Sequence, residues 1–387
     1  MSWEYKTLDQ LGEVSRGRSK HRPRNDPSLF GGKYPFIQTA DVKAANFYIT
    51  EYDTTYNEKG LAQSRLWNPG TLCITIAANI ADTGILAMDA CFPDSVMGFL
   101  PYEGIADVRF VKYCFDILQQ NCKKISQGAA QDNLSWEKLS TILFPAPPIE
   151  VQTKIADILS TYDNLIENNK KQIKLLEEAA QRLYKEWFVD LHFPGHETTP
   201  IVDGVPVGWR RERLVDLVDV QYGYAFDGSL FNTAKNGMPI IRIRNIPSGN
   251  TDDYTTEEAD SQYIVHNGDI LVGMDGEFHI NSWSGPDAYL VQRTCSFRPN
   301  NSEMKGYLLQ AIYEPIKYFE NTVVGATVAH LGKKHIDTIN VLTCPTNLYV
   351  PLQDYYEQRQ LLLNQNWLLA EARDRLLPKL MNGELEV

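Results

Sequence analysis

One stretch of the chain, from Ile149 to Asp190, carries apolar residues at alternating steps of four and three. The spacing is sustained for more than four heptads, which is typical of a long helix that packs against another helix. Pro148 precedes the stretch and Pro194 follows it, whereas no Pro or Gly falls inside it. The sequence therefore predicts a spacer helix of roughly 60 Å, at about 1.5 Å per residue. Its seam residues are Ile155, Leu159, Tyr162, Ile166, Asn169, Ile173, Leu176, Ala180, Leu183 and Trp187.

The signals that precede this helix return after it, which indicates a tandem repeat of one unit, a globular domain followed by a long helix. The offset between matching residues falls smoothly, from 206 (Trp3 to Trp209) to 193 (Leu183 to Leu376). A strand is expected from Tyr34 to Val42. The matching segments are Pro35–Val42 with Pro239–Ile246, Gly70–Ile74 with Gly268–Val272, Gly128–Leu134 with Gly325–Leu331, and Glu178–Glu186 with Glu371–Lys379.

The second long helix is expected from about Pro351 to Met381, with seam residues that include Leu362, Leu369 and Leu376. Two helices of successive repeats pack antiparallel when the chain runs out along one and returns along the other. We therefore predict an α+β fold, in which two α/β domains related by a pseudo-two-fold are separated by an antiparallel, coiled-coil-like helix pair. The expected boundaries are residues 1–148 and 209–348 for the domains, 149–190 and 349–387 for the helices, and 191–208 for a linker.

Composition and motifs exclude several classes of function. The sequence contains no Gly-rich phosphate loop, no GxSxG elbow, no HExxH pair and no motif for S-adenosylmethionine. No apolar segment follows the first Met, and the best apolar run, Gly70–Met88, is broken by polar residues, so we expect a cytoplasmic protein without a membrane span. The cysteines form no CxxC pair, which favours reduced thiols and no metal site; they are Cys73, Cys91, Cys114, Cys122, Cys295 and Cys344.

A basic loop is the strongest ligand signal in the chain. Five cations fall within nine residues, at Arg16, Arg18, Lys20, Arg22 and Arg24, although the net charge of the protein is −12. Arg and Lys so placed suit phosphates and guanine edges, and binding follows local patches more than total charge. The alternative is a solvated surface loop, but this concentration of charge in an acidic chain favours nucleic acid.

The second domain carries different side chains at the equivalent loop, Tyr222 to Phe226. Arg242 and Arg244 are expected to supply polar contacts there, unless they simply face solvent as alternate strand residues. In the first domain, the amides of Gln131 and Asn133 are able to contact adenine, although capping a helix near Ser135 would explain them almost as well. The full set of candidate DNA-binding residues adds Gln38, Tyr222, Tyr224, His330, Lys333 and Lys334.

Several segments, in duplicate and in order, make the chain resemble the specificity subunit of type I restriction–modification enzymes. The resemblance covers essentially the whole chain. It implies two target-recognition domains, each reading one part of a split, asymmetric site in double-stranded DNA, separated by two antiparallel helices. The matching segments are Phe144–Leu159, Tyr162–Lys171, Leu183–Phe188, Pro206–Trp209 and Leu377–Gly383.

The same resemblance implies a non-catalytic chain that works with partners. The helices are expected to bind two methyltransferase (modification) subunits, and restriction subunits to join that core. S-adenosylmethionine, ATP and Mg²⁺ are then expected on the partners, and the complex would be a site-specific adenine methyltransferase and an ATP-dependent endodeoxyribonuclease. Two alternatives remain. One is a free-standing restriction–methylation enzyme, which would need catalytic motifs, and the other is a coiled-coil adaptor with two domains that do not bind DNA.

Overall fold

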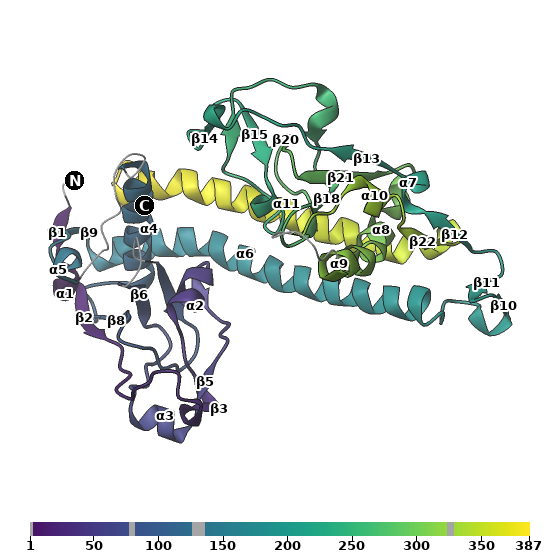
Figure 1. Cartoon of the computed structure of the whole chain (residues 1–387). Helices are drawn as coiled ribbons and strands as arrows, with labels where there is room; N and C mark the ends of the chain where they lie inside the picture. The colour runs from purple at the N-terminus through teal and green to yellow at the C-terminus, as the bar shows by residue number, and fades with distance from the viewer. Residues whose placement is uncertain (1–2, 77–81, 126–135, 323–328) are drawn as a thin grey trace. The chain divides into compact units, whose positions relative to one another are not determined.

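A computed structural model describes residues 3–76, 82–125, 136–322 and 329–387 (Figure 1). The chain forms two compact units, of which the first comprises Met1–Leu165 and Leu369–Val387 and the second comprises Ile166–Leu368. The long helices α6 (Ile149–Tyr184) and α11 (Val350–Met381) each contribute one part to each unit. The first unit therefore takes its residues from both ends of the sequence. Among the described residues, no helix has the length and apolar character needed to cross a membrane.

The first unit is built on a five-stranded sheet covered by α4 (Val108–Ile125). Apolar and β-branched residues bury two of its central strands along their whole length and the third over its first four residues. Phe110, Val111 and Phe115 of α4 share one hydrophobic core with Leu72 and Phe99 of the sheet. In sheet order the strands are β2 (Gly12–Arg16), β8 (Val96–Pro101), β6 (Leu72–Thr75), β7 (Thr83–Leu86) and β4 (Tyr48–Ile49), all antiparallel except the β4–β7 pair.

Shorter elements complete the first unit, and one of them corrects an expectation from the sequence. The strand expected from Tyr34 to Val42 is wrong, because β3 (Phe30–Pro35) ends early and α2 (Thr39–Ala44) begins. The Asp41 carboxylate accepts the backbone N–H of Gln38 (2.6 Å), which caps α2 and stops the strand. The other elements are β1 (Glu4–Lys6) paired with β9 (Phe144–Ala146), β5 (Thr55–Tyr56) paired with β3, α1 (Leu8–Leu11), α3 (Glu58–Ala62), α5 (Trp136–Leu139) and the 3₁₀ turn Pro27–Leu29.

The second unit contains two larger sheets and two small ribbons. The four-stranded sheet has the order β13 (Val218–Tyr222), β21 (Thr294–Pro299), β18 (Ile270–Gly273) and β19 (Ile280–Ser282). The five-stranded sheet has the order β14 (Phe231–Asn232), β16 (Tyr254–Thr255), β15 (Met238–Ile241), β20 (Ala288–Leu290) and β17 (Ile264–Val265). The ribbons are β12 (Arg210–Arg213) with β22 (Asn340–Thr343), and β10 (Ile201–Val202) with β11 (Val205–Pro206).

The helices of the second unit bury an aromatic core. Phe297 of β21, Tyr307 of α8 and Phe188 belong to one cluster of buried residues together with Trp209. Phe188 lies in a π-helical segment, Lys185–Val189, that follows α6 directly, so the regular α-helix ends six residues before Asp190. The helical elements are α7 (Leu214–Leu217), α8 (Lys305–Ala311), α9 (Tyr313–Thr322) and α10 (Lys333–Ile336), with 3₁₀ turns at His196–Thr198, Gly228–Leu230, Ile243–Asn245, Ser261–Tyr263, Ser302–Met304 and Thr346–Leu348.

The two units repeat the same local contacts, so the predicted tandem repeat is confirmed. In the first unit, Gln152 Oε1 accepts the backbone N–H of Asp107 (3.1 Å), just before α4 begins. In the second, Gln353 Oε1 accepts the backbone N–H of Gly306 (3.0 Å) at the start of α8. The antiparallel pair β2–β8 has its counterpart in β13–β21.

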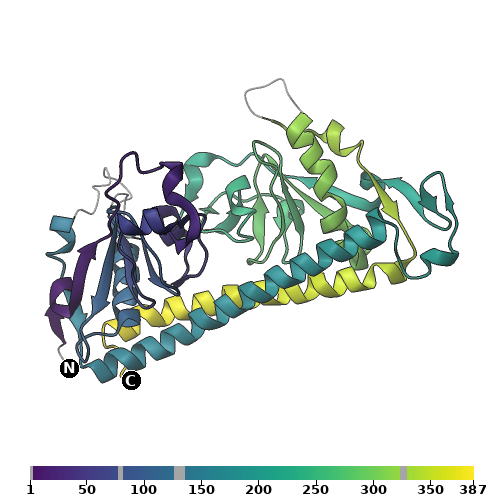
Figure 2. The same cartoon turned by 90° about the horizontal axis from the view of Figure 1, so that it is seen from below.

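Within each unit, α6 and α11 pack antiparallel, and Figure 2 shows them side by side in teal and yellow. In the first unit, Ile155 near the start of α6 shares a core with Leu380 near the end of α11. In the second unit, Asn169 Nδ2 donates to Gln365 Oε1 (3.4 Å) and Glu177 Oε1 accepts from Arg359 Nε (2.6 Å), so rising numbers on α6 meet falling numbers on α11. The seam residues Ile155, Leu159, Ile166, Asn169, Ile173 and Ala180 are buried, and Tyr162, Leu176, Leu183, Trp187, Leu362, Leu369 and Leu376 are half-buried.

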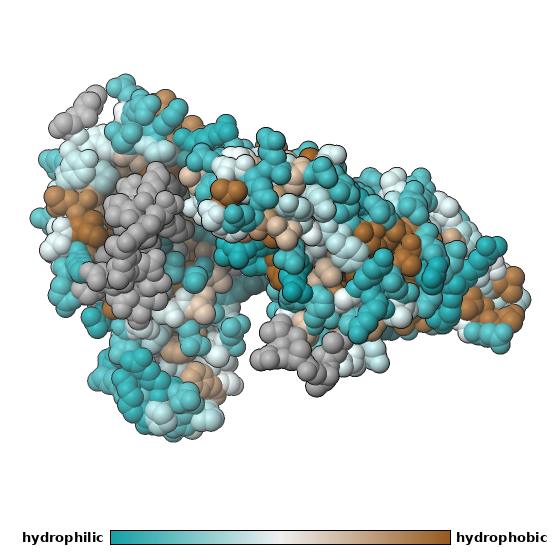
Figure 3. Space-filling view, turned by 45° about the horizontal axis from the view of Figure 1, so that its top comes forward, coloured by the Kyte–Doolittle hydropathy of each residue, from teal (hydrophilic) through white to brown (hydrophobic). Residues whose placement is uncertain are grey.

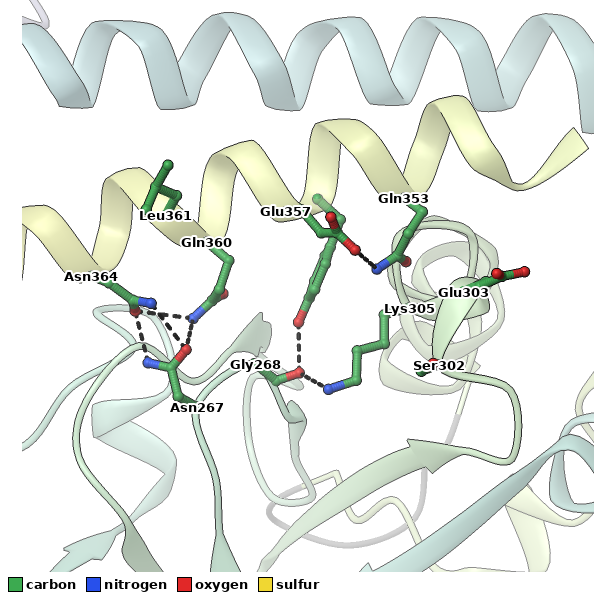
Figure 4. A pocket seen from close by; sticks show the side chains of 11 residues that line it. Asn267, Gly268, Ser302, Glu303, Lys305, Gln353, Glu357, Gln360, Leu361 and Asn364 are labelled. Carbon is green, nitrogen blue, oxygen red and sulfur yellow. Dashed lines mark hydrogen bonds between the residues drawn. The ribbon is translucent and has the colours of Figure 1, made fainter. Parts of the chain in front are cut away.

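A polar network attaches the second unit's sheets to α11, and Figure 4 shows its side chains pointing toward one another beside a cavity of about 440 Å³. Gln360 Nε2 donates to the carbonyl of Trp283 (2.7 Å) and to Asn267 Oδ1 (3.0 Å), while Gln360 Oε1 accepts from Ser282 Oγ (2.8 Å). Tyr356 Oη donates to the carbonyl of Gly268 (2.6 Å). Because Gln360, Ser282 and Trp283 are all buried, the Ser282 hydroxyl and the Trp283 carbonyl are bonded by Gln360 in place of water.

Replacing Gln360 by leucine should lower the free energy of unfolding of the second unit by about 1–3 kcal/mol, because buried hydrogen-bonding groups lose their partner. Urea denaturation followed by tryptophan fluorescence measures the change. Gln358→Leu, at an exposed position of the same helix, is the matched control and is expected to change stability by less than about 0.5 kcal/mol. Equal losses in the two variants would contradict a structural role for the network.

Candidate nucleic-acid interface

The basic loop of the first unit starts where β2 ends and crosses the turn that precedes β8. The backbone N–H of Gly17 donates to the carbonyl of Val96 (2.8 Å), and that of Arg18 donates to the carbonyl of Phe92 (3.0 Å). A Cβ atom at Gly17 would lie 2.3 Å from the carbonyl oxygen of Pro93, so only glycine allows this close approach. The loop is therefore held against the sheet while the side chains of its cations extend from it.

The five cations of the loop divide into two groups. Arg24 forms an ion pair with Asp94 (Nη2–Oδ1 2.6 Å), and Arg22 lies 3.9 Å from the same carboxylate and donates to the carbonyl of Ser19 (2.7 Å). Arg16, Arg18 and Lys20 are exposed, and the described part of the chain offers them no ion-pair partner. The latter group is therefore available to a ligand, whereas Arg22 and Arg24 stabilise the loop.

The turn that ends the loop is also held by internal bonds. His21 Nε2 lies 2.7 Å from the Asp26 carboxylate. Hydrogen bonds from the backbone and hydroxyl of Ser28, followed by that from His21, lower the pKa of Asp26 to about 2. Asp26 is therefore ionised at neutral pH, and the 3₁₀ turn Pro27–Leu29 keeps its N-terminal cap.

Arg65 joins the basic loop, and sequence reasoning missed it. Its Nη1 donates to Ser15 Oγ (2.9 Å), and its guanidinium lies 3.8 Å above the ring of Trp67. The segment lies beside the loop because Ser64 Oγ donates to the carbonyl of Arg18 (2.7 Å) and the His21 N–H donates to Gln63 Oε1 (2.9 Å). The spacing of an Arg two residues before a Trp is a weak signal for such stacking.

Of the amide residues predicted to contact DNA in the first unit, the structure describes only Gln38. Gln38 is exposed, and its backbone N–H takes part in capping α2. Gln131 and Asn133 lie outside the described residues. No contact with the basic loop is found for Gln38 among the described residues, so a shared surface stays a prediction.

The aromatic loop of the second unit occupies the equivalent place, with equivalent hydrogen bonds. The N–H of Gly223 donates to the carbonyl of Thr294 (3.0 Å), and the N–H of Tyr224 donates to the carbonyl of Leu290 (2.9 Å). The ring of Tyr224 contacts those of Phe226 (4.8 Å) and Tyr263 (5.2 Å) between centroids. Tyr222 is half-buried, and burial raises its pKa to about 12. Half-exposed aromatic rings therefore replace the cations of the first unit.

The two arginines predicted for the second unit have different environments. Arg242 follows β15, and its guanidinium lies 5.7 Å from the ring centre of Phe231. The N–H of Val291 donates to the carbonyl of Ile241 (3.1 Å), which brings Arg242 toward the turn between β20 and β21. Arg244 instead forms a two-nitrogen ion pair with Asp253, and the hydrogen bonds to that carboxylate raise the Arg244 pKa.

The remaining predicted residues lie near α10. His330 Nδ1 lies 2.5 Å from Asp275 Oδ1. Lys333 and Lys334 are exposed in the first turn of α10, where no carboxylate pairs with them among the described residues. His335 Nδ1 accepts the N–H of Gly332 (3.1 Å), and burial followed by the charge of Lys334 lowers the His335 pKa. His335 is therefore a structural residue, whereas the two lysines are exposed and His330 is half-exposed beside Asp275.

Arg293 was missed from the sequence, yet it lies among the predicted residues. It occupies the turn between β20 and β21, and its Nε lies 3.3 Å from Asp275 Oδ2. The N–H of Gln292 donates to the carbonyl of Tyr224 (2.7 Å), and that of Met274 donates to the carbonyl of Arg293 (2.9 Å). The turn thus joins the aromatic loop to the His330 segment. Nothing in the local sequence distinguishes Arg293 from an ordinary turn residue.

The described residues also include the cysteines and acidic side chains that a metal site or a reactive thiol would need. Within residues 3–76, 82–125, 136–322 and 329–387, no group of three or more His, Cys, Asp or Glu side chains could hold a metal ion. Burial raises the pKa of the Cys73, Cys114 and Cys295 thiols, so these cysteines stay protonated and unreactive.

Comparisons with known proteins match the chain over most of its length. The model of the type I restriction modification DNA specificity domain matches residues 1–178 and 206–347. The type I restriction enzyme MjaIX specificity subunit of Methanocaldococcus jannaschii is 26% identical, over 100% of this chain and 94% of that protein. The HindI specificity subunit of Haemophilus influenzae is 22% identical, over 97% and 98%. A crystal structure of a type I restriction–modification S subunit from M. genitalium has the same fold, with a TM-score of 0.55 and 14% identity over 98% of this chain and 96% of that one.

Proposed function

The chain belongs to the family of type I restriction modification DNA specificity domains, and we propose that its two units read two different parts of one bipartite DNA site. One observation carries the proposal. Loops with equivalent backbone hydrogen bonds present exposed cations in the first unit, at Arg16 and Arg18, and aromatic rings in the second, at Tyr222 and Tyr224. Equal scaffolds with unlike side chains suit a ligand whose two parts differ in sequence.

Partner subunits would supply the catalytic activity, since the sequence carries no catalytic motif. We propose two modification subunits as the direct partners, with S-adenosylmethionine bound to them and ATP and Mg²⁺ bound to restriction subunits. Exposed apolar residues support a protein partner, because Leu175 and Leu361 on the helix pair of the second unit are 65% and 57% exposed and line an open cavity of about 380 Å³. Figure 3 shows further hydrophobic residues, in brown, at the tip formed by β10 and β11, where Ile201 and Val202 are exposed.

The direct test is to co-express the chain with candidate modification subunits and to map methylated adenines in the host genome. The proposal predicts a motif of two short defined parts separated by a spacer of undefined sequence. A single continuous motif would contradict the two-part assignment. Failure of the assembled complex to prefer any DNA sequence would leave the protein-adaptor function instead.

The length of α6 should influence the spacer of the DNA site. A matched insertion of four residues, after Ile166 in α6 and after Trp367 in α11, lengthens each helix by about 6 Å, which is slightly more than one full turn. That length is close to two base steps of about 3.4 Å, so the mapped spacer should grow by one or two base pairs. An insertion of the same length after Asp203, in the turn between β10 and β11, serves as the control and should leave the spacer unchanged. An unchanged spacer in the helix variant would refute the idea that the helices set it.

A further inference from the structure

Arg293 has a backbone conformation that most residues avoid. Its φ is +73°, in the left-handed region that glycine and asparagine adopt with less strain. Hydrogen bonds on both sides hold this turn, from Gln292 N–H to the Tyr224 carbonyl (2.7 Å) and from Met274 N–H to the Arg293 carbonyl (2.9 Å). Strain of this kind persists where surrounding contacts impose it, and it is concentrated at binding sites. An arginine at a position that glycine would adopt with less strain suggests that its side chain has a function.

The side chain of Arg293 is oriented by a carboxylate that is itself held by a histidine. Asp275 Oδ2 lies 3.3 Å from Arg293 Nε, and Asp275 Oδ1 lies 2.5 Å from His330 Nδ1. Because Nδ1 is this close to a carboxylate, it carries the proton and donates it. Arg293 Nη1 lies 3.4 Å from the same Nδ1, which therefore cannot accept from the guanidinium. The contact with Asp275 fixes Nε, and the terminal Nη1 and Nη2 groups remain able to donate to a ligand.

The charges of this group favour a base edge over a phosphate. Arg293 and Asp275 together carry no net charge, so their pair attracts phosphate weakly, yet the directional donors of the guanidinium are kept. Paired donors in a fixed plane match the O6 and N7 acceptors of guanine in the major groove, whereas adenine presents a donor at N6 beside N7. The side chains of Arg293 and His330 are 51% and 45% exposed, so a duplex can reach them.

Among the described residues, the first unit carries a different side chain at the position of Arg293. The pairing of β2 with β8 and of β13 with β21 aligns Met97 with Cys295, so Ser95 occupies the position of Arg293. In that unit the turn instead carries Asp94, which neutralises Arg22 and Arg24. The two units therefore present different side chains at the equivalent turn, as expected if they contact different base pairs.

We propose that Arg293, oriented by Asp275 beside His330, is a specificity-determining residue with which the second unit contacts a guanine in the major groove. This inference rests on the proposed DNA-recognition function. Asp275 is a positioning residue in this scheme, since its carboxylate acts through Arg293. Lys333 and Lys334, which are exposed in the first turn of α10, are suited to the neighbouring phosphates.

The test compares variants of the full complex with modification subunits on a duplex library with randomised positions and by adenine methylation in the host. Arg293→Asn tolerates the left-handed backbone but removes the guanidinium, and Arg293→Lys keeps the charge without the paired donors. Each should relax preference for guanine at one position of the second half-site by about 5- to 150-fold, with the rest of the motif unchanged. Asp275→Asn should relax the same position to a smaller extent.

Lys334→Ala is the matched control, and it should reduce the salt dependence of binding by about one ion without changing any base preference. If Arg293→Asn selects the parental motif in full, or weakens binding to all sequences equally, the inference is wrong. A wild-type complex with no sequence preference would instead refute the proposed function itself. Thermal melting of each variant separates these outcomes from loss of folding. If Arg293→Asn unfolds, Arg293→Lys provides the test instead.

Discussion

Replacing Arg373 by methionine is expected to lower the free energy of unfolding of the first unit by about 3–5 kcal/mol, because it leaves a buried carboxylate without its cation. The side chain of Asp163 is 1% exposed and is bonded by Arg373 on one oxygen and by Tyr113 Oη on the other (2.5 Å). Burial, followed by the charge of Asp163, raises the pKa of Tyr113, so its hydroxyl stays protonated and donates. With Arg373 removed, one phenol hydroxyl cannot replace the missing ion pair.

The measurement is urea denaturation together with hydrogen exchange of the α4 amides, which report on the first unit separately. Arg375→Met is the matched control on the same helix, since Arg375 is 77% exposed and pairs only with Glu371 one turn away among the described residues. An exposed pair of this kind contributes less than about 1 kcal/mol. A loss of stability in Arg373→Met no larger than in the control would contradict the assignment of a buried ion pair.

Removing the three exposed cations of the basic loop should have the largest effect on DNA affinity. In the triple variant of Arg16, Arg18 and Lys20 to alanine, the slope of log K against log salt should become less negative by up to about 2.7, at about 0.9 for each phosphate that is no longer neutralised. We expect affinity to fall on the order of 10- to 1,000-fold at low salt, with a difference that narrows as salt rises. Fluorescence anisotropy of a labelled duplex with the assembled complex measures both quantities.

The double variant of Arg22 and Arg24 to alanine removes nearly as much formal charge from the same loop and is therefore a sharp control. Both residues already face Asp94, so we expect a change in slope of less than about one and a lower melting temperature of the first unit. Equal changes in slope for the two variants would show that total charge matters and that the ion pairs with Asp94 do not. An unchanged slope in the triple variant would show that the loop is an ordinary solvated surface without a role in DNA binding.

The sequence was sufficient to predict the architecture because periodic and repeated patterns are local. Heptad spacing depends on neighbouring residues along one helix, and it located α6 without any knowledge of its partner. The second helix, α11, has a less regular seam and was predicted as the repeat of the first. The tandem repeat followed from matched segments, and it correctly paired the basic loop with the aromatic loop 206 residues later, as Gly17 and Gly223 show by their equivalent hydrogen bonds. Asp41 was a local signal too, because it caps α2, but the segment that contains it was predicted as part of a strand.

Tertiary structure alone decided which charged groups are available and which are neutralised. Asp94 lies 70 residues from Arg24, and Asp163 lies 210 residues from Arg373, so no pattern along the chain reveals either pair. The same holds for Arg293, whose importance rests on Asp275 and His330 from other segments. A sequence determines periodicity through contacts one turn or one strand apart, whereas the electrostatics of a binding surface arise from side chains that only folding brings within a few ångströms.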